Sequence, residues 1–460
     1  MRKLDRSGRF ALGATGLLLA LGVFLLASVV LSTPAQGDGM VIRKFEDRWQ
    51  PLREGSQQAL ILQRDGLQRM LLAIEVDDPG VSNPVWILPV PAGPGQVTVD
   101  VLADFPRVSG TEVFGGARDS LSKIGLVAAG MQVWPAAAAI LYAVIDLFTG
   151  PRVRIAGKAP AAKAAAAAPP ITVHQRVEKE GMVAEVITAK EGGALYRYLE
   201  GKGLKITPGS LPVLDHYAGK DYTFITSWLG GGDAGTPGGP EGGARHLSRG
   251  IEVRFPSREM FFPLRPTSVY GEAVVPASIW VAGYVTPRPY ADIAPHTTVR
   301  YHVSTLYGSE RTEFARAFYE AENGRYTRID INTASRRFTD DLWIDPASPG
   351  TVGLAVATFV VTHGLVTLFL IVAALSAALS LAVGWVVYEP LRTRRGAIRL
   401  AVVGLANCLT LIGLIVAGIQ ALPGTGKRFA AYLAVFSILY VSAVFAMTFG
   451  AGVVIESLRP

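Results

Sequence analysis

The chain has 460 residues, 50% of them hydrophobic, and only 18% of its residues are charged, which excludes a purely soluble protein. The net charge of +7 gathers beside the apolar segments near the two ends, and residues 10–350 are close to neutral. This distribution argues against nucleic acid as a partner, because phosphate binding needs a basic face on the body. The single cysteine, Cys408, excludes an internal disulfide and a cysteine-based metal site.

Residues 1–35 have the three-part layout of a secretory signal. The basic stretch 1–9 precedes an uncharged apolar run from Phe10 to Leu31, and small residues follow as far as Ala35. The run is also long enough to span a bilayer. The sequence therefore predicts either a cleaved signal peptide or a retained N-terminal anchor, and both place the following residues outside the cytoplasm.

Residues 40–350 predict a β-rich extracytoplasmic domain with a few helices. Apolar runs flank Asp65-Gly66, a pair typical of a tight β-hairpin because both turn positions need positive φ. Alternating and β-branched runs predict further strands, and helical spacing of apolar residues predicts two short helices. The strands are expected at 59–62, 70–74, 85–91, 99–102, 183–188, 222–226, 251–255 and 279–284, and the helices at 193–203 and 310–322.

Two low-complexity stretches divide this domain. An Ala/Pro-rich linker at 156–170 separates the region 40–155 from the second part, 171–350, and a glycine-rich loop occupies 229–244. The composition of both stretches favours exposed chain over packed structure.

The segment 124–149 is almost entirely apolar. A helix spanning the membrane here would carry residues 150–350 inside and turn the later Arg-rich loop outward, against the rule that cytoplasmic loops are basic. We therefore expect a buried or membrane-surface element. The spanning helix remains the alternative, supported by Arg152, Arg154 and Lys158 just after the segment.

Residues 351–460 predict an all-α bundle of three transmembrane helices, near 360–386, 400–421 and 430–455. The loop after the first helix is the most basic short loop in the chain, which marks it as cytoplasmic. Its cations are Arg392, Arg394, Arg395 and Arg399. Three crossings after an exported domain predict a cytoplasmic C-terminus. The fold class is thus α+β, with a β-rich extracytoplasmic domain followed by a C-terminal all-α transmembrane bundle.

One face of the first predicted helix carries small residues, which let helices approach closely. They are Ala373, Ala377, Ser380 and Gly384. This face serves either packing within the bundle or docking onto another membrane protein.

Several stretches resemble a known family. An Ala-Leu-Ile-Leu strand with its Asp-Gly turn at 59–66 leads to Trp-Ile-Leu-Pro-Val-Pro at 86–91, followed by Ala-Leu-Tyr-Arg-Tyr-Leu at 194–199 and Phe-Pro-Leu at 262–264. In this order they are similar to the bacterial domain-of-unknown-function family numbered 2330, over roughly residues 42–290. The resemblance implies an exported bacterial protein and supplies no activity. Members often carry early cysteines, which this chain lacks.

No catalytic, cofactor or metal site is predicted. Ser120 and Lys123 fit the S-x-x-K spacing, but the partner motifs S-D-N and K-T-G are absent. His296 and His302 have no acidic residue at ligand spacing. The acidic residues Asp340, Asp341 and Asp345 allow acid–base work or cation binding, yet a solvated patch beside the membrane is the expected role.

These observations predict a membrane-anchored extracytoplasmic protein with a non-enzymatic binding or scaffold role and no cofactor. The alternative is a subunit of a membrane complex for transport or electron transfer, with a membrane-bound hydrolase as a third reading. Expected partners are the lipid bilayer and, through the small-residue face, another membrane protein.

Overall fold

The computed structural model describes residues 41–45, 48–52, 57–74, 85–103, 105–106, 108–133, 171–204, 208–229, 249–304, 312–409, 411–423 and 426–459. The predicted signal or anchor at 1–35, the linker at 156–170 and the glycine-rich loop beyond residue 229 lie outside these residues. The fold class is α+β, with mixed sheets in the first part of the chain and helices at its C-terminal end.

The predicted hairpin is confirmed. β3 (Gln57–Arg64) and β4 (Leu67–Ile74) pair antiparallel across Asp65 and Gly66, whose φ angles are 53° and 75°. Such positive angles match the turn that aligns with the twist of a hairpin. Ala59, Ile61 and Met70 of this hairpin point into one core.

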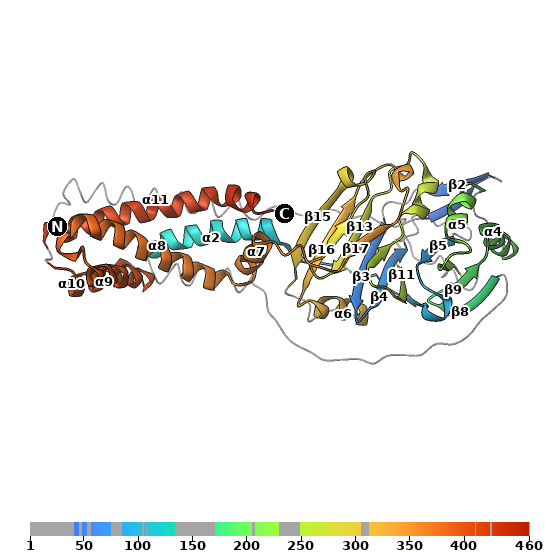
Figure 1. Ribbon diagram of the computed structural model, residues 1–460, viewed down its shortest axis with the longest axis horizontal. Helices are drawn as coiled ribbons and strands as arrows, with labels where there is room; N and C mark the ends of the chain where they lie inside the picture. The colour runs from blue at the N-terminus through green and yellow to red at the C-terminus, as the bar shows by residue number, and fades with distance from the viewer. Residues whose placement is uncertain are drawn as a thin grey trace, which may run out of the picture. The chain divides into compact units, whose positions relative to one another are not determined.

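An eight-stranded sheet is built around this hairpin (Figure 1). All neighbours are antiparallel except β3 and β13, which are parallel. The strand order is β6 (Thr98–Leu102), β11 (Arg249–Pro256), β4, β3, β13 (Ala277–Ala282), β16 (Arg325–Ile331), β15 (Thr297–Val303) and β7 (Thr111–Glu112).

A four-stranded antiparallel sheet packs against one face of the eight-stranded sheet, through a shared apolar core. Its order is β5 (Val85–Val90), β10 (Thr223–Leu229), β9 (Met182–Ala189) and β8 (Ile171–Lys179). The helices α4 (Gly192–Gly201) and α5 (Leu211–Tyr217) cover the other face of this smaller sheet. The helix α6 (Glu313–Ala321) packs on the outer face of the larger one.

Two small sheets complete the β-rich part. The first joins β12 (Met260–Phe262), β17 (Leu342–Asp345) and β14 (Thr286–Arg288), and the second pairs β1 (Val41–Phe45) with β2 (Arg48–Leu52). The 3₁₀ helix η3 (Arg265–Tyr270) follows β12.

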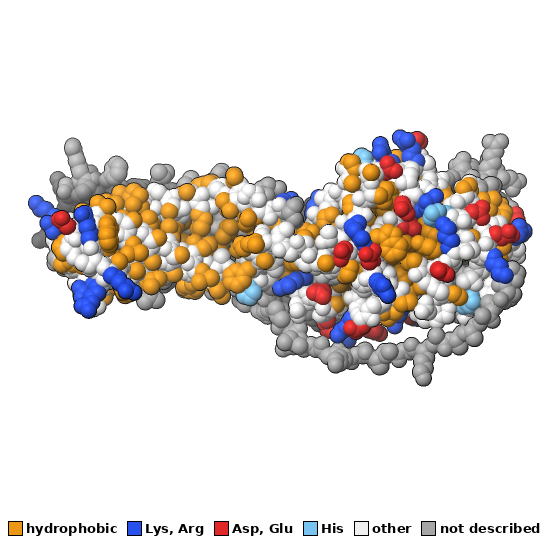
Figure 2. Space-filling view, in the orientation of Figure 1, with side chains coloured by type: hydrophobic (Ala, Val, Ile, Leu, Met, Phe, Trp, Pro, Cys, Tyr) orange, Lys and Arg blue, Asp and Glu red, His pale blue; other side chains and the backbone are white. Residues whose placement is uncertain are grey.

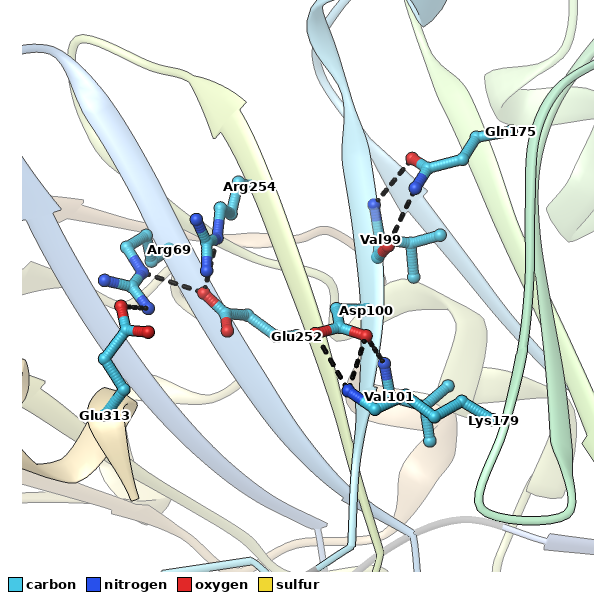
Figure 3. Close-up of polar contacts among 9 residues, drawn as sticks. All are labelled: Arg69, Val99, Asp100, Val101, Gln175, Lys179, Glu252, Arg254 and Glu313. Carbon is cyan, nitrogen blue, oxygen red and sulfur yellow. Dashed lines mark hydrogen bonds and ion pairs between the residues drawn. The ribbon is translucent and has the colours of Figure 1, made fainter. Parts of the chain in front are cut away.

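Polar side chains join the edges of the two large sheets (Figure 3). Gln175 follows an irregularity in the register of β8, and its amide both donates to the carbonyl oxygen and accepts from the N–H of Val99, each at 2.9 Å. Lys179 donates to Asp100 at 3.1 Å. The Gln175 amide thus satisfies backbone groups of β6 at a sheet edge, where they would otherwise be unpaired.

A buried carboxylate organises the outer face of the larger sheet (Figure 3). Glu252 accepts from Arg69 at 2.8 Å and from Arg254 at 2.7 Å, and Arg69 also pairs with Glu313 of α6 at 3.7 Å. A buried charge is tolerated only with such partners. Through Arg69 the cluster contacts α6, whose side chains Phe314 and Phe318 pack on the sheet.

The C-terminal helices have an apolar surface. Most of the large apolar side chains that are exposed among the described residues lie between Val352 and Val454, and Figure 2 shows them gathered on the helices. The helices α8 (Gly364–Val387) and α11 (Lys427–Ser457) are long and apolar enough to cross a membrane. These two helices suggest membrane association.

The first predicted helix is divided. α7 (Val352–Thr362) ends at His363, whose φ and ψ of −129° and 46° are not helical, and α8 begins at Gly364. The hydroxyl of Thr362 and Nδ1 of His363 are 2.7 Å apart, and the His363 ring stacks on Phe359. These contacts accommodate the break.

The second predicted helix, 400–421, departs further from its prediction than the first. Instead of one span over 400–421, the chain forms α9 (Arg394–Leu405), the short turn η8 (Ala406–Leu409) and α10 (Leu411–Ala421). Helices of 12 and 11 residues are about 18 and 16 Å long, roughly half the thickness of a bilayer core.

This pair is a helical hairpin that returns to the end of the bundle where it began. Leu400 lies against Gly384, and Asn407, further along, donates to Ser376 at 3.0 Å, so α9 runs back along α8. Gly418, late in α10, lies against Phe429 at the start of α11. Because α11 then runs the length of the bundle, residues 364–457 contain two full-length helices and a half-length hairpin.

The C-terminal end of α11 lies beside the start of α7. The backbone of Leu458 packs directly on Gly353, and Arg459 pairs with Glu112 at 3.7 Å. Both ends of the segment 353–458 are therefore at one end of the bundle. The C-terminal residues thus lie beside the starts of α2 (Val113–Val133) and α7.

The bundle also includes α2, a helix from the middle of the chain. Ser122 donates to the carbonyl oxygen of Thr448 at 3.3 Å, and Ile124 and Ala128 join the apolar core of the bundle. For the segment 124–149 the sequence predicts a buried or membrane-surface element, with a spanning helix as the alternative. Residues 124–133 belong to α2 and pack in the bundle, and 134–149 lie outside the described residues.

We expect Gly404→Ala to destabilise the bundle, because a Cβ there would lie 2.6 Å from Cβ of Ser380 and 2.9 Å from Cα of Ala377. Overpacking of this kind typically costs about 1–3 kcal/mol. Gly450→Ala is the matched control, since nothing lies within 4 Å of its Cβ position. Thermal denaturation in mild detergent should show a lower Tm for Gly404→Ala alone, and equal Tm values would contradict the close packing of α9 on α8.

Candidate functional site

A cavity of about 80 Å³ lies between the two large sheets. Strands β3, β4 and β11 contribute one wall and β5 and β10 another, and the segment from Phe262 to Thr267 closes a side. The lining is mostly apolar and includes Leu72, Val85, Leu88, Ile225, Ile251 and Phe262. This volume accommodates several water molecules or a small ligand.

Two polar atoms at the cavity have no hydrogen-bond partner among the described residues. They are Nε1 of Trp86 and Oε1 of Gln57, both shielded from solvent. The indole N–H is a donor and the amide oxygen an acceptor. A buried polar group left unpaired costs about 1–3 kcal/mol. Small-molecule sites typically combine a mostly apolar lining with a few polar groups, such as this donor and this acceptor.

The closing segment is held from two sides. On the cavity side, Nε2 of Gln57 donates to the hydroxyl of Thr267, and the backbone N–H of Gln57 donates to Pro276 at 2.7 Å. On the far side, the backbone N–H of Arg265 donates to Oδ1 of Asp341 at 3.1 Å. One amide and one carboxylate thus contribute to the position of this wall.

Asp341 is the most unusual acid of the site. It is only 4% exposed, and the hydroxyl of Tyr217 lies 2.9 Å from each of its carboxylate oxygens. Burial raises the pKa of Asp341 to about 6, although the hydrogen bonds from Arg265 and Tyr217 oppose this shift. Burial and the adjacent carboxylate also raise the pKa of Tyr217. The pair links α5 to the wall of the cavity.

Aromatic rings extend from this pair to strands β12 and β17. Tyr217 and Tyr222 have ring centroids 5.0 Å apart, Tyr222 and Phe261 6.2 Å, and Phe261 and Trp343 5.0 Å. The angles between their planes are those of tilted or edge-to-face pairs, which are favourable arrangements. Phe261 directly precedes Phe262, which lines the cavity.

The three acidic residues Asp340, Asp341 and Asp345 do not form one solvent-exposed patch. Asp340 is exposed and accepts from the backbone N–H of Asp341, and Asp345 accepts from Ala347, whereas Asp341 is buried. The prediction of a solvated role is wrong for Asp341. The residues that the sequence analysis missed, Trp86, Gln57 and Tyr217, lie in strands and a helix where nothing local distinguishes them from packing residues.

The other sequence candidates do not meet at one place. Ser120 and Lys123 lie on α2 within the bundle. His296 precedes β15 and His302 is near its end, so the strand separates them by about 20 Å. His302 stacks on Tyr326, and burial lowers its pKa to about 4. Among the described residues, no group of three or more His, Cys, Asp and Glu is placed to hold a metal ion.

The small-residue face of α8 meets another helix of the same chain. Gly404 of α9 lies against Ala377 and Ser380, and Leu400 lies against Gly384. Ser380 is also 2.7 Å from the hydroxyl of Tyr432 of α11. Three of the four predicted positions thus pack within the bundle.

Comparison of the chain with protein-family models, with curated proteins and with solved structures found no match. The similarity to the family numbered 2330 therefore stays a resemblance of short stretches.

We expect the stability of the wild-type chain to fall as the pH rises from about 4 to about 6. Folding raises the pKa of Asp341 to about 6, above its ordinary value of about 3.9, so the folded state binds this proton more tightly than the unfolded state. The stabilisation by the protonated form is complete below about pH 4 and is lost above about pH 6, a change of roughly 2–3 kcal/mol.

The variant Asp341→Asn checks this assignment. Its amide oxygen still accepts from Arg265 and Tyr217, but it does not titrate. Thermal denaturation of the full chain in detergent, between pH 4 and pH 7, should show a fall of several degrees in Tm for the wild type relative to the variant. Parallel pH profiles would show that Asp341 does not titrate in this range.

Proposed function

We propose that this chain is a membrane-anchored, non-enzymatic binding protein whose β-rich domain lies outside the cytoplasm. The observation that carries the binding role is the cavity between the two sheets, where the indole N–H of Trp86 and the amide oxygen of Gln57 are both unpaired. A ligand that pairs with both atoms removes the free-energy penalty of leaving them unpaired.

The chemistry of the cavity defines the class of ligand. Its mostly apolar lining favours a small apolar molecule or group. Such a ligand needs one acceptor for Trp86 and one donor for Gln57, as a secondary amide has. With only a few heavy atoms, binding is expected to be weak, with a Kd on the order of 1 mM for the smallest ligands.

The proposed orientation follows from strand pairing and charge. β6 pairs with β11, and β3 with β13, so the residues before α2 and those after it share one sheet. They must lie on the same side of a membrane. The cations of 392–399, together with Lys427 and Arg428, lie at the end of the bundle where the α9–α10 hairpin begins and ends, and the preference of basic loops for the cytoplasm places that end inside.

This arrangement revises one element of the sequence-based topology. Leu458 packs on Gly353, and Arg459 pairs with Glu112. We therefore propose that the C-terminus lies outside the cytoplasm, with the β-rich domain. The similarity to the family numbered 2330 agrees with export and adds no activity.

The alternative role, a subunit of a membrane complex, needs a surface other than the one first considered. Three residues of the small-residue face, Ala377, Ser380 and Gly384, already contact α9. The hydrolase reading loses its candidate nucleophile, because Ser120 lies on a helix of the bundle. Neither role has an observation that favours it over binding in the cavity.

Ligand binding in the cavity can be measured at Trp86. In the full chain labelled with 5-fluorotryptophan, the ¹⁹F resonance of Trp86 is assigned by its loss in Trp86→Phe. We expect N-methylacetamide to shift this resonance saturably, and N,N-dimethylacetamide to bind more weakly because it has no donor for Gln57. Trp280, which lies beneath Arg328 on the other face of the sheet, provides the internal control. Without a saturable shift of Trp86 alone, the cavity is not a binding site.

The orientation can be measured by cysteine accessibility in intact cells. With Cys408→Ser as background, single cysteines replace Lys220, Arg395 or Arg459. We expect a membrane-impermeant maleimide to label positions 220 and 459 from outside and position 395 only after permeabilisation. Labelling of 459 only after permeabilisation would support the original cytoplasmic C-terminus, and labelling of 395 from outside would reverse the whole orientation.

A further inference from the structure

Six cations gather at one end of the helical bundle, which we call the basic end. They come from two separate segments, the first from the end of the α8–α9 connection into the first half of α9, and the second at the start of α11. The members are Arg392, Arg394, Arg395, Arg399, Lys427 and Arg428.

The α9–α10 hairpin brings the two segments together. The rings of Tyr388, at the end of α8, and Tyr432, near the start of α11, have centroids 6.0 Å apart. A span over 400–421 would instead have placed Lys427 and Arg428 at the opposite end of the bundle.

These cations differ from those of the β-rich domain in their partners. All six are exposed, and in the described part of the chain none of them forms an ion pair with a carboxylate. In the β-rich domain, by contrast, Arg69, Arg176 and Arg254 each pair with a buried carboxylate. Uncompensated positive charge at the basic end attracts an anionic partner from outside the chain.

The surface next to the basic end indicates which class of anion it binds. Val386 is 74% exposed, Ile398 58% and Trp385 46%, so apolar side chains border the charges directly. Figure 2 shows the same border of blue and orange at the end of the helices. A partner with a phosphate next to acyl chains fits this border, whereas a free anion or a nucleic acid leaves the apolar side uncovered. Arg side chains suit phosphate because the guanidinium donates two parallel hydrogen bonds.

We propose that the basic end binds the headgroups of anionic phospholipids, and that both cationic segments belong to one headgroup site. The proposal rests on the proposed function in one respect, that the bundle lies in a bilayer. The site would hold this end of the bundle at the membrane surface, because clusters of Lys and Arg beside a membrane segment attract anionic lipids.

Native mass spectrometry of the full chain tests this proposal. The chain is purified in mild detergent and mixed with equal amounts of phosphatidylglycerol and phosphatidylcholine, and the retained lipids are counted. We expect about tenfold preferential retention of phosphatidylglycerol by the wild type. Equal retention of the two lipids would overturn the proposal.

Three variants locate the site. Arg394→Gln with Arg395→Gln, and Lys427→Gln with Arg428→Gln, should each reduce the preference several-fold, and the fourfold variant should abolish it. The control removes the same charge from exposed cations of the β-rich domain, as Lys190→Gln, Lys220→Gln, Arg258→Gln and Arg316→Gln. An equal loss in the control, or no loss when Lys427 and Arg428 are changed, would overturn the joint site. Unchanged Tm values in the absence of lipid establish that the variants are folded.

The outcome is separable from that of the orientation experiment. If position 395 is labelled from outside while the lipid preference persists, the proposed orientation fails and the headgroup site stands. If position 395 is protected and the lipid preference is absent, the headgroup site fails and the orientation stands.

Discussion

The parallel pairing of β3 with β13, together with that of β6 with β11, is the constraint on which the rest of the molecule depends. It joins residues 57–102 to residues 249–331 in one sheet, although α2 of the helical bundle lies between them in the sequence. Strands in one sheet cannot lie on opposite sides of a bilayer. In the proposed orientation, the residues before Val113 and those after Ile171 therefore lie on the same side of the membrane.

A second constraint sets the geometry of the bundle. Gly404 allows the backbones of α9 and α8 to approach closely, and the side chains of Asn407 and Ser376 hydrogen-bond at 3.0 Å beside this contact. In an apolar environment a polar side chain needs such a partner. The α9–α10 hairpin is thereby held against the C-terminal half of α8. The helix α11 then starts beside the end of α8. The position of the cations at one end and of Leu458 at the other follows from this contact.

The sequence predicted the elements whose signals are local. The Asp65-Gly66 turn requires positive φ, and the apolar spacing around Phe314 and Phe318 gives α6, with both residues buried. It did not predict β8, because this edge strand is polar and its side chains reach neighbouring edges, as Gln175 does to Val99. Two half-length helices and one membrane-spanning helix can have the same hydropathy. The hydropathy of residues 400–421 therefore does not distinguish the hairpin from a single span. The cations Lys427 and Arg428 directly after the turn were the only local sign, since a basic turn is unusual outside the cytoplasm. The burial of Asp341 depends on α5 and η3, which are distant in sequence.

The cavity and the buried carboxylate form one system. Asp341 accepts from the backbone N–H of Arg265, the same short segment carries Thr267, and Thr267 accepts from the amide of Gln57, whose oxygen is buried and unpaired among the described residues. Ionisation of Asp341 is opposed by burial, so the state of this carboxyl alters the free energy of the wall near its pKa of about 6. A ligand that hydrogen-bonds Gln57 stabilises one position of the wall. Under the proposed function, any coupling between a ligand at Gln57 and the proton on Asp341 would be reciprocal, because linkage between two binding equilibria is.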